Sequence, residues 1–205
     1  MHWRKKLLRS CYLYIIVKAN VEKARKIVSS GIHILQLRDK RVSDRKLFEI
    51  GREIASFCRK KKVFFIVNDR IDIAIASRAD GVHLGQGDLS LYEARKIAPR
   101  NFLIGISTHS VKEALKAQKE GADYISFGPV FATRTKPLLS PIGTEKIALL
   151  DKKIKIPYFV IGNVNLKNLK LLKDRGARRI AMHSSVYKLK NPRQKILSFR
   201  KEISL

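Results

Sequence analysis

The chain has 205 residues, 45% of them hydrophobic, which is enough for one substantial core and short for two ordinary domains. Its 44 Lys and Arg against 17 Asp and Glu give a formal charge of +27, which favours anionic partners such as phosphorylated small molecules or nucleic acid. No apolar run reaches the roughly 18 residues of a membrane span. Cys11 and Cys58 lie in no CxxC or metal-ligand spacing. We therefore expect one cytoplasmic domain, residues 1–205, that contacts no membrane.

Apolar runs of strand length alternate with segments of helical period along the chain. The basic start and the short apolar run after it lack a cleavage site, so that run is interpreted as the first strand rather than a signal peptide. The predicted strands are Tyr12–Val17, His33–Leu37, Val63–Val67, Gly81–Leu84, Phe102–Ile106, Tyr124–Phe127, Ile156–Ile161 and Arg179–Met182. The predicted helices are Val21–Ser29, Ser43–Lys61, Ile71–Ser77, Leu91–Ala98, Val111–Glu120, Glu145–Leu150, Leu166–Arg175 and Gln194–Ile203. Eight such units predict an α/β fold, a (β/α)8 TIM barrel, with an open doubly wound sheet as the alternative.

Polar residues gather after seven of the eight predicted strands, and the C-terminal ends of barrel strands are where such folds place their chemistry. In chain order these residues are Gln36, Arg38, Lys40, Asn68, Asp69, Arg70, Gln86, Asp88, Ser107, Gly128, Thr133, Thr135, Lys136, Gly162, Asn163, Ser184 and Ser185. Arginine and lysine on separate loops suit phosphate oxygens. Two aspartates beside them suit Mg²⁺ shared with a diphosphate. Capping of the following helices is the alternative for Asp69 and Asp88.

A second anion site is predicted after strands seven and eight, where such barrels often form a phosphate cup from backbone N–H groups. Gly162, Asn163 and the Ser184–Ser185 pair are the candidates, with ordinary loop and cap chemistry as the alternative. The histidines form no metal-binding motif. We expect His33 and His83 in the core, His109 as a helix cap, and His183 beside the cup.

Five segments, in order, resemble those of thiamine phosphate synthases, in the superfamily that also holds the thiazole tautomerases. They are Gln36–Lys40, Val67–Arg70, Gly81–Asp88, Gly105–Ser107 and Asp123–Lys136. The resemblance spans about residues 10 to 190. It implies a transferase that joins 4-amino-2-methyl-5-hydroxymethylpyrimidine diphosphate to hydroxyethylthiazole phosphate, or to its carboxylated form. The products would be thiamine phosphate and diphosphate, with Mg²⁺ as the cofactor and no protein nucleophile.

The resemblance also implies roles for individual residues. The pyrimidine diphosphate would contact Gln36, Arg38, Lys40, Asn68, Ser107 and Lys136, with Leu37, Asp39 and Arg134 in the same binding segments. Arg38, Lys40, Ser107 and Lys136 would also be catalytic. Asp69 and Asp88 would hold Mg²⁺. The thiazole phosphate would contact Thr133, Thr135, Gly162, His183 and Ser184.

The chain departs from the family pattern on the thiazole side. Asn163 stands where a second glycine is usual, and Ala181–His183 replaces a more aliphatic run. A tautomerase-like isomerase is therefore one alternative, although both metal aspartates are present. A non-catalytic binder of thiamine precursors or of nucleic acid is the other. The scattered basic residues, as in Arg59–Lys62, disfavour nucleic acid. The sequence leaves a homo-oligomer open.

Overall fold

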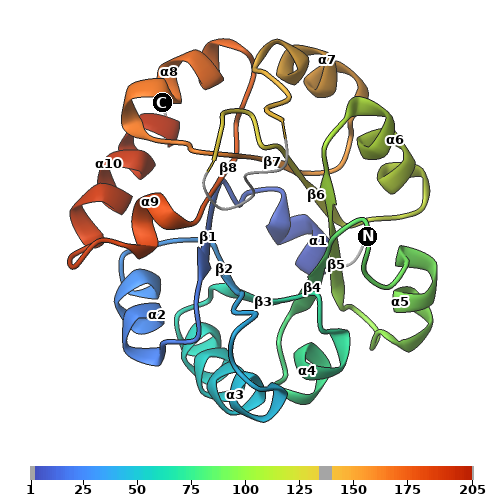
Figure 1. The fold of residues 1–205 in the computed structure, drawn as a ribbon, viewed down its shortest axis with the longest axis vertical. Helices are drawn as coiled ribbons and strands as arrows, with labels where there is room; N and C mark the ends of the chain where they lie inside the picture. Colours follow the sequence, from blue (N-terminus) through green and yellow to red (C-terminus); the bar gives the residue numbers. More distant parts are fainter. Residues whose placement is uncertain (1–2, 134–139, 205) are drawn as a thin grey trace.

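Eight parallel strands form a closed barrel in the computed structural model, which describes residues 3–133 and 140–204. The strands are β1 (Leu13–Val17), β2 (Ile34–Leu37), β3 (Phe64–Asn68), β4 (Gly81–Leu84), β5 (Leu103–Thr108), β6 (Tyr124–Phe127), β7 (Tyr158–Ile161) and β8 (Ile180–Met182). Each pairs with the next, and β1 pairs with β8 through Tyr14 and Ala181 (Figure 1). The predicted TIM barrel is confirmed, and the open sheet is excluded.

Helices surround the barrel as an outer ring (Figure 1). They are α2 (Val21–Val28), α3 (Asp44–Lys60), α4 (Ile71–Ala76), α5 (Leu91–Ile97), α6 (Val111–Lys119), α7 (Glu145–Lys153), α8 (Leu166–Asp174), α9 (Ser184–Tyr187) and α10 (Arg193–Ser204). Side-chain caps fix several starts; for example, Ser43 accepts a hydrogen bond from the Lys46 amide at the start of α3. Among the described residues, no helix is both long and apolar enough to cross a membrane.

The strands are buried on both faces, which is why their sequences read as continuous apolar runs. Along β1, Leu13, Ile15 and Val17 pack toward the helices in one large core. Tyr14 and Ile16 point the opposite way, into a smaller core inside the barrel. This alternation decides which strand residues can face a ligand.

Helix α1 (Trp3–Leu8) was not predicted and lies across the N-terminal end of the barrel (Figure 1). Arg4 forms an ion pair with Asp80 at 3.0 Å, just before β4. Lys5 forms one with Asp123 at 2.6 Å, just before β6. Leu8 is 1% exposed and belongs to the core inside the barrel. The helix therefore closes the end of the barrel opposite the predicted site.

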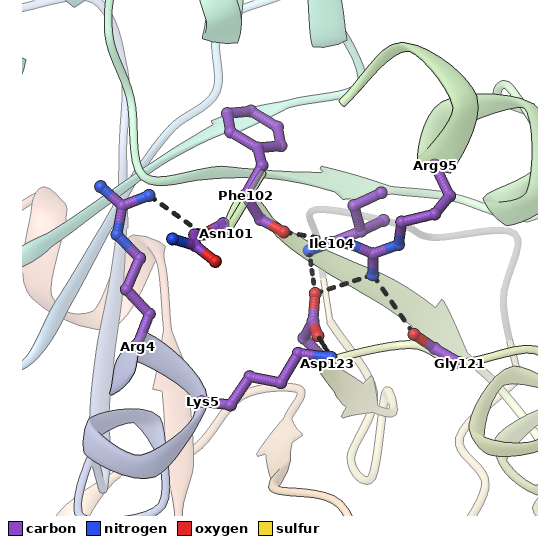
Figure 2. Close-up of polar contacts among 8 residues, drawn as sticks. All are labelled: Arg4, Lys5, Arg95, Asn101, Phe102, Ile104, Gly121 and Asp123. Atoms are coloured by element: carbon purple, nitrogen blue, oxygen red, sulfur yellow. Dashed lines mark hydrogen bonds and ion pairs between the residues drawn. The ribbon is translucent and has the colours of Figure 1, made fainter. Parts of the chain in front are cut away.

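Asp123 is the centre of the polar cluster beneath α1, and its side chain is fully buried (Figure 2). Its Oδ2 accepts hydrogen bonds from the Ile104 amide at 2.7 Å and from Arg95 at 2.9 Å. Its Oδ1 has the Lys5 ammonium as an ion-pair partner, without hydrogen-bond geometry to any described residue. One carboxylate thus joins α1 and α5 to the start of β5.

Candidate active site

One pocket opens at the C-terminal ends of the strands and has about 910 Å³ of empty space, its open mouth included. That volume suits a small-molecule ligand. Its lining residues come from all eight strands or the loops after them: Tyr14, Ile16, Gln36, Arg38, Asn68, His83, Ser107, His109, Ser126, Gly128, Pro129, Thr133, Ile161, Gly162, Asn163, Val164, Ala181, Met182, His183 and Ser185. Seven of the predicted site residues are thereby brought together: Gln36, Arg38, Asn68, Ser107, Thr133, Gly162 and His183.

The strand positions differ from the prediction in one respect. Asn68 and Ser107 belong to β3 and β5 themselves rather than to the loops after them. The run Leu103–Thr108 continues as strand because Ser107 and Thr108 pair with Ser126 and Phe127 of β6. Being on strands, these polar side chains are held by the barrel itself, which favours a preorganised pocket.

The floor of the pocket is a buried layer of hydrogen-bonded polar groups. Gln36 Nε2 donates to the Tyr14 hydroxyl at 2.7 Å, and that hydroxyl lies 3.1 Å from the Tyr124 hydroxyl. The Tyr124 hydroxyl lies 3.3 Å from His83 Nδ1, and His83 Nε2 lies 3.0 Å from Ser107 Oγ. His83 is 5% exposed, as its predicted core position requires.

Asp69 and Asp88 form a carboxylate pair next to the pocket: Asp69 follows the lining residue Asn68, but Lys40, Asp69 and Asp88 are not themselves among the lining residues. Burial and a hydrogen bond to the Asp88 carboxyl raise the pKa of Asp69. Lys40 lies 3.0 Å from Asp69 Oδ2, and the Gly85 amide donates to Asp88 at 2.6 Å. Two carboxyl groups in contact favour a proton or a cation between them.

Neither aspartate caps a helix, so the alternative prediction for them is wrong. Arg70 occupies the N-cap position of α4 without a side-chain capping hydrogen bond, whereas Asp69 adopts φ +61° and its carboxyl contacts Asp88. Ser90 caps α5. In the part of the chain that the structure describes, no group of three or more His, Cys, Asp or Glu side chains could hold a metal. An ion held by this pair would need its remaining ligands from substrate and water.

The opposite side of the pocket is formed by the loop after β7, whose backbone is unusual. Gly162 adopts φ +119°, and a Cβ there would lie 2.6 Å from Pro129 Cα. Asn163 adopts φ +49°, a conformation that asparagine tolerates better than most residues, as predicted. The loop after β7 therefore keeps its positive-φ turn although one glycine is missing, and Gly162, Asn163 and Val164 line the pocket.

His183 faces this side with both ring nitrogens buried and without a hydrogen-bond partner among the described residues. Burial, together with the positive charges of Arg38 and Lys18, lowers the pKa of His183 to about 4. The ring is therefore neutral near pH 7 and surrounded by a positive field. Buried polar atoms without partners beside cations indicate a place for an anionic ligand.

Two predicted contact residues turn away from the pocket. Leu37 belongs to the core between barrel and helices, within contact distance of Gly51 on α3. Asp39 accepts hydrogen bonds from the amides of Ala19 and Arg41, and these outweigh its burial and lower its pKa. Both residues support the loop that carries Arg38 and Lys40 rather than line the pocket.

The remaining predicted contacts follow β6 and β8 in the sequence. Arg134, Thr135 and Lys136 lie outside the described residues. Ser184 opens α9, a short helix where the sequence predicted a loop. The roles predicted for these residues stay predictions.

Several pocket residues were not singled out from the sequence. Tyr14 and Ser126 could have been found from the alternation of inward positions on β1 and β6. His109 was predicted to cap α6, but Ser110 caps it, and His109 Nδ1 contacts the Gly128 carbonyl at the pocket wall. Only the folded barrel reveals that contact.

Comparison with known proteins agrees with this geometry. Residues 13–186 match the family model described as thiamine monophosphate synthase. The thiamine-phosphate synthase of Methanospirillum hungatei is 45% identical over 86% of this chain and 89% of its own length. That of Halalkalibacterium halodurans is 44% identical over 78% of this chain and 76% of its own. The chain spans only 52% of a Prochlorococcus marinus relative with the same name.

The fold comparison identifies the same group. The structure of thiamine phosphate pyrophosphorylase from Pyrococcus furiosus superposes with a TM-score of 0.88 and is 34% identical, covering 98% of both chains. The family model covers residues 13–186, which include all eight strands of the barrel. The chain therefore belongs to the thiamine monophosphate synthase family.

Proposed function

We propose that this chain is a transferase that condenses the aminopyrimidine diphosphate with a hydroxyethylthiazole phosphate, giving thiamine phosphate and diphosphate. The observation that carries the proposal is its similarity, over most of both chains, to proteins named thiamine-phosphate synthase. Two differently charged groups support it: the Lys40–Asp69–Asp88 cluster, next to the pocket residue Asn68, and the positive field around His183 within the pocket. Two phosphorylated substrates need two such groups.

The chemistry demands stabilisation of a leaving group. The C–O bond from the pyrimidine methylene to the diphosphate breaks, and the electron-rich ring supports the cation that remains. Arg38 lines the pocket and Lys40 lies beside Asp69, and both would stabilise the charge that develops on the diphosphate. Lys136, which follows β6 in the sequence, is proposed for the same task.

Mg²⁺ is the proposed cofactor, and the carboxylate pair fits it. Asp69 and Asp88 would hold the ion, since Mg²⁺ is usually bound by one or two carboxylates together with substrate phosphates and waters. Bound there, it would neutralise charge on the diphosphate. Lys40 already lies beside Asp69 and would stay close to the same oxygens.

The acceptor substrate is assigned to the other side of the pocket. Its phosphate would bind the loop at Gly162 and Asn163 and the start of α9, within the positive field around His183. This anchor would place the thiazole nitrogen for attack on the methylene carbon and reduce the entropic barrier of the bimolecular step. Thr133 lines the same pocket and is a candidate hydroxyl donor.

Nothing in the comparisons favours the tautomerase alternative, because the relatives described above carry synthase names. An isomerase would also have no use for the carboxylate pair. We expect no nucleic-acid partner, a cytoplasmic location, and either a monomer or a homo-oligomer; these stay predictions.

The test is a coupled assay of diphosphate release with each substrate alone and with both, with and without Mg²⁺. We expect release only when both substrates and Mg²⁺ are present. Asp88→Asn should lower turnover by at least roughly 10²-fold, whereas Asp72→Asn, which removes a carboxylate paired with Arg70, should not. Mg²⁺-independent isomerisation of the carboxylated thiazole phosphate would overturn the proposal.

A further inference from the structure

The buried polar layer under the pocket is larger than packing requires. Tyr14, Gln36 and Tyr124 are each at most 1% exposed, and the core inside the barrel that holds the two tyrosines is otherwise made of leucine, isoleucine, phenylalanine, alanine and cysteine. Buried polar groups weaken a core unless each is hydrogen-bonded, and a phenylalanine would fill the same space without that demand. The layer is therefore expected to serve the pocket above it.

The aromatic rings hold this layer rigidly. The Tyr14 ring meets those of Tyr124 and Phe159 at centroid distances of 5.9 and 5.3 Å, the latter edge to face. Tyr124 fits only because residue 105 is glycine, since a Cβ there would lie 2.1 Å from the ring. The two phenolic oxygens consequently have little freedom to change partners.

We infer that the hydrogen bonds run in one direction along the layer. Gln36 Nε2 donates to the Tyr14 oxygen, and the Tyr14 and Tyr124 hydroxyls lie 3.1 Å apart, so the inferred direction has the Tyr14 proton donated to the Tyr124 oxygen. The Tyr124 proton is then directed to His83 Nδ1. Burial raises the pKa of both phenols, so each keeps its proton at neutral pH.

The direction of the chain fixes the tautomer of His83. Because Nδ1 accepts, a neutral ring carries its proton on Nε2, which lies 3.0 Å from Ser107 Oγ and 3.2 Å from Ser126 Oγ. Ser107 then accepts from the histidine and keeps its own proton for the pocket. At the other end of the layer, Gln36 donates an N–H to Tyr14. Its Oε1 remains available as an acceptor, with no hydrogen-bond partner among the described residues.

We propose that Tyr14, Tyr124 and His83 are positioning residues that make Gln36 a fixed acceptor and Ser107 a fixed donor for the heteroaromatic substrate. This inference rests on the proposed function. Oε1 of Gln36 accepts from the exocyclic amino group of the pyrimidine, and Ser107 donates to a ring nitrogen. A 4-oxo pyrimidine presents an acceptor where the amino group presents a donor, so the site rejects it.

The first measurement needs no variant. In the unliganded protein, long-range ¹H–¹⁵N NMR correlations of the histidine rings report which nitrogen of His83 carries the proton. We expect the Nε2–H tautomer. A proton on Nδ1, alone or together with one on Nε2, overturns the proposal, because the chain would then run the other way or be broken.

The second measurement compares the 4-amino and 4-oxo pyrimidine diphosphates, by calorimetric binding and by kcat/KM with the thiazole phosphate. Tyr124→Phe removes the acceptor of the Tyr14 proton, which frees the Gln36 amide to turn over. We expect the preference for the amino compound to fall at least tenfold in this variant.

Tyr158→Phe is the matched control, since the Tyr158 hydroxyl binds Asp151 and the Gly176 carbonyl outside the barrel. It should keep the wild-type preference. An unchanged preference in Tyr124→Phe, or a wild-type protein that accepts the 4-oxo compound equally, overturns the proposal. The wild-type protein could instead show no turnover but still bind the 4-amino compound in preference to the 4-oxo compound, with that preference lost in Tyr124→Phe. This result would count against the proposed reaction alone and would support the positioning role of the chain.

Discussion

Replacing Asp123 by alanine tests the polar cluster that closes the lower end of the barrel. The change removes an acceptor 2.7 Å from the Ile104 amide and 2.9 Å from Arg95, together with the ion pair to Lys5. The Asp123 side chain is fully buried, so no water replaces these contacts. Leaving the buried Ile104 amide without its acceptor costs about 1–3 kcal/mol, and losing the ion pairs to the partly exposed Lys5 and Arg95 adds up to about 1 kcal/mol each. That is a large part of the about 5–15 kcal/mol by which domains are usually stable.

Urea denaturation followed by circular dichroism and by fluorescence measures this loss, provided that the two transitions coincide. Lys5→Ala should cost no more than about 1 kcal/mol, because the lysine side chain is 45% exposed and solvent screens its pair. Glu93→Ala, which breaks an exposed pair with Lys96 on α5, should cost less than about 0.5 kcal/mol. A loss below about 1 kcal/mol for Asp123→Ala would refute the assignment of this carboxylate as the link between α1, α5 and β5.

Three further changes test the site. Gly162→Ala should raise KM for the thiazole phosphate. It should also lower the free energy of unfolding by more than the ~1 kcal/mol that a positive φ costs a residue with a side chain, since the new Cβ would clash with Pro129. Gly121→Ala, also at positive φ but with open space around it, should show only that smaller loss. As the pH falls from 6.5 to about 4, the free energy of unfolding of the wild type should decrease relative to that of His183→Val by on the order of 2 kcal/mol, because His183 is protonated at a higher pH in the unfolded chain than in the folded one. Parallel stability curves of the two proteins against pH, measured in urea, would contradict this. Asp69→Asn should lower turnover and raise the Mg²⁺ concentration that gives half-maximal turnover, and an unchanged metal titration would exclude this residue as a ligand.

Much of the barrel could be predicted because its strands are buried on both faces. Val67 and its neighbours form an apolar run that no exposed strand would carry. The polar residues at strand ends were found for the same reason, since Asn68 and Ser107 interrupt such runs. The exact ends could not be predicted, because pairing of Thr108 with Phe127 joins segments far apart in sequence.

Other features depend on contacts that local sequence does not encode. Helix α1 has no acidic residue in its first turn, and its anchors are Asp80 and Asp123, more than 70 residues away. The layer from Gln36 to His83 likewise joins strands across the barrel. Spacing alone also left Asp69 divided between capping and metal binding, and its contact with Asp88 excludes capping.

The central claim is that one pocket joins two phosphorylated substrates. The most direct test is ³¹P NMR of the purified protein with the pyrimidine diphosphate, the thiazole phosphate and Mg²⁺ together. We predict that thiamine phosphate and diphosphate appear in equal amounts and that neither forms when one substrate is omitted. Diphosphate release without the thiazole phosphate, or no reaction with both substrates present, would contradict the account.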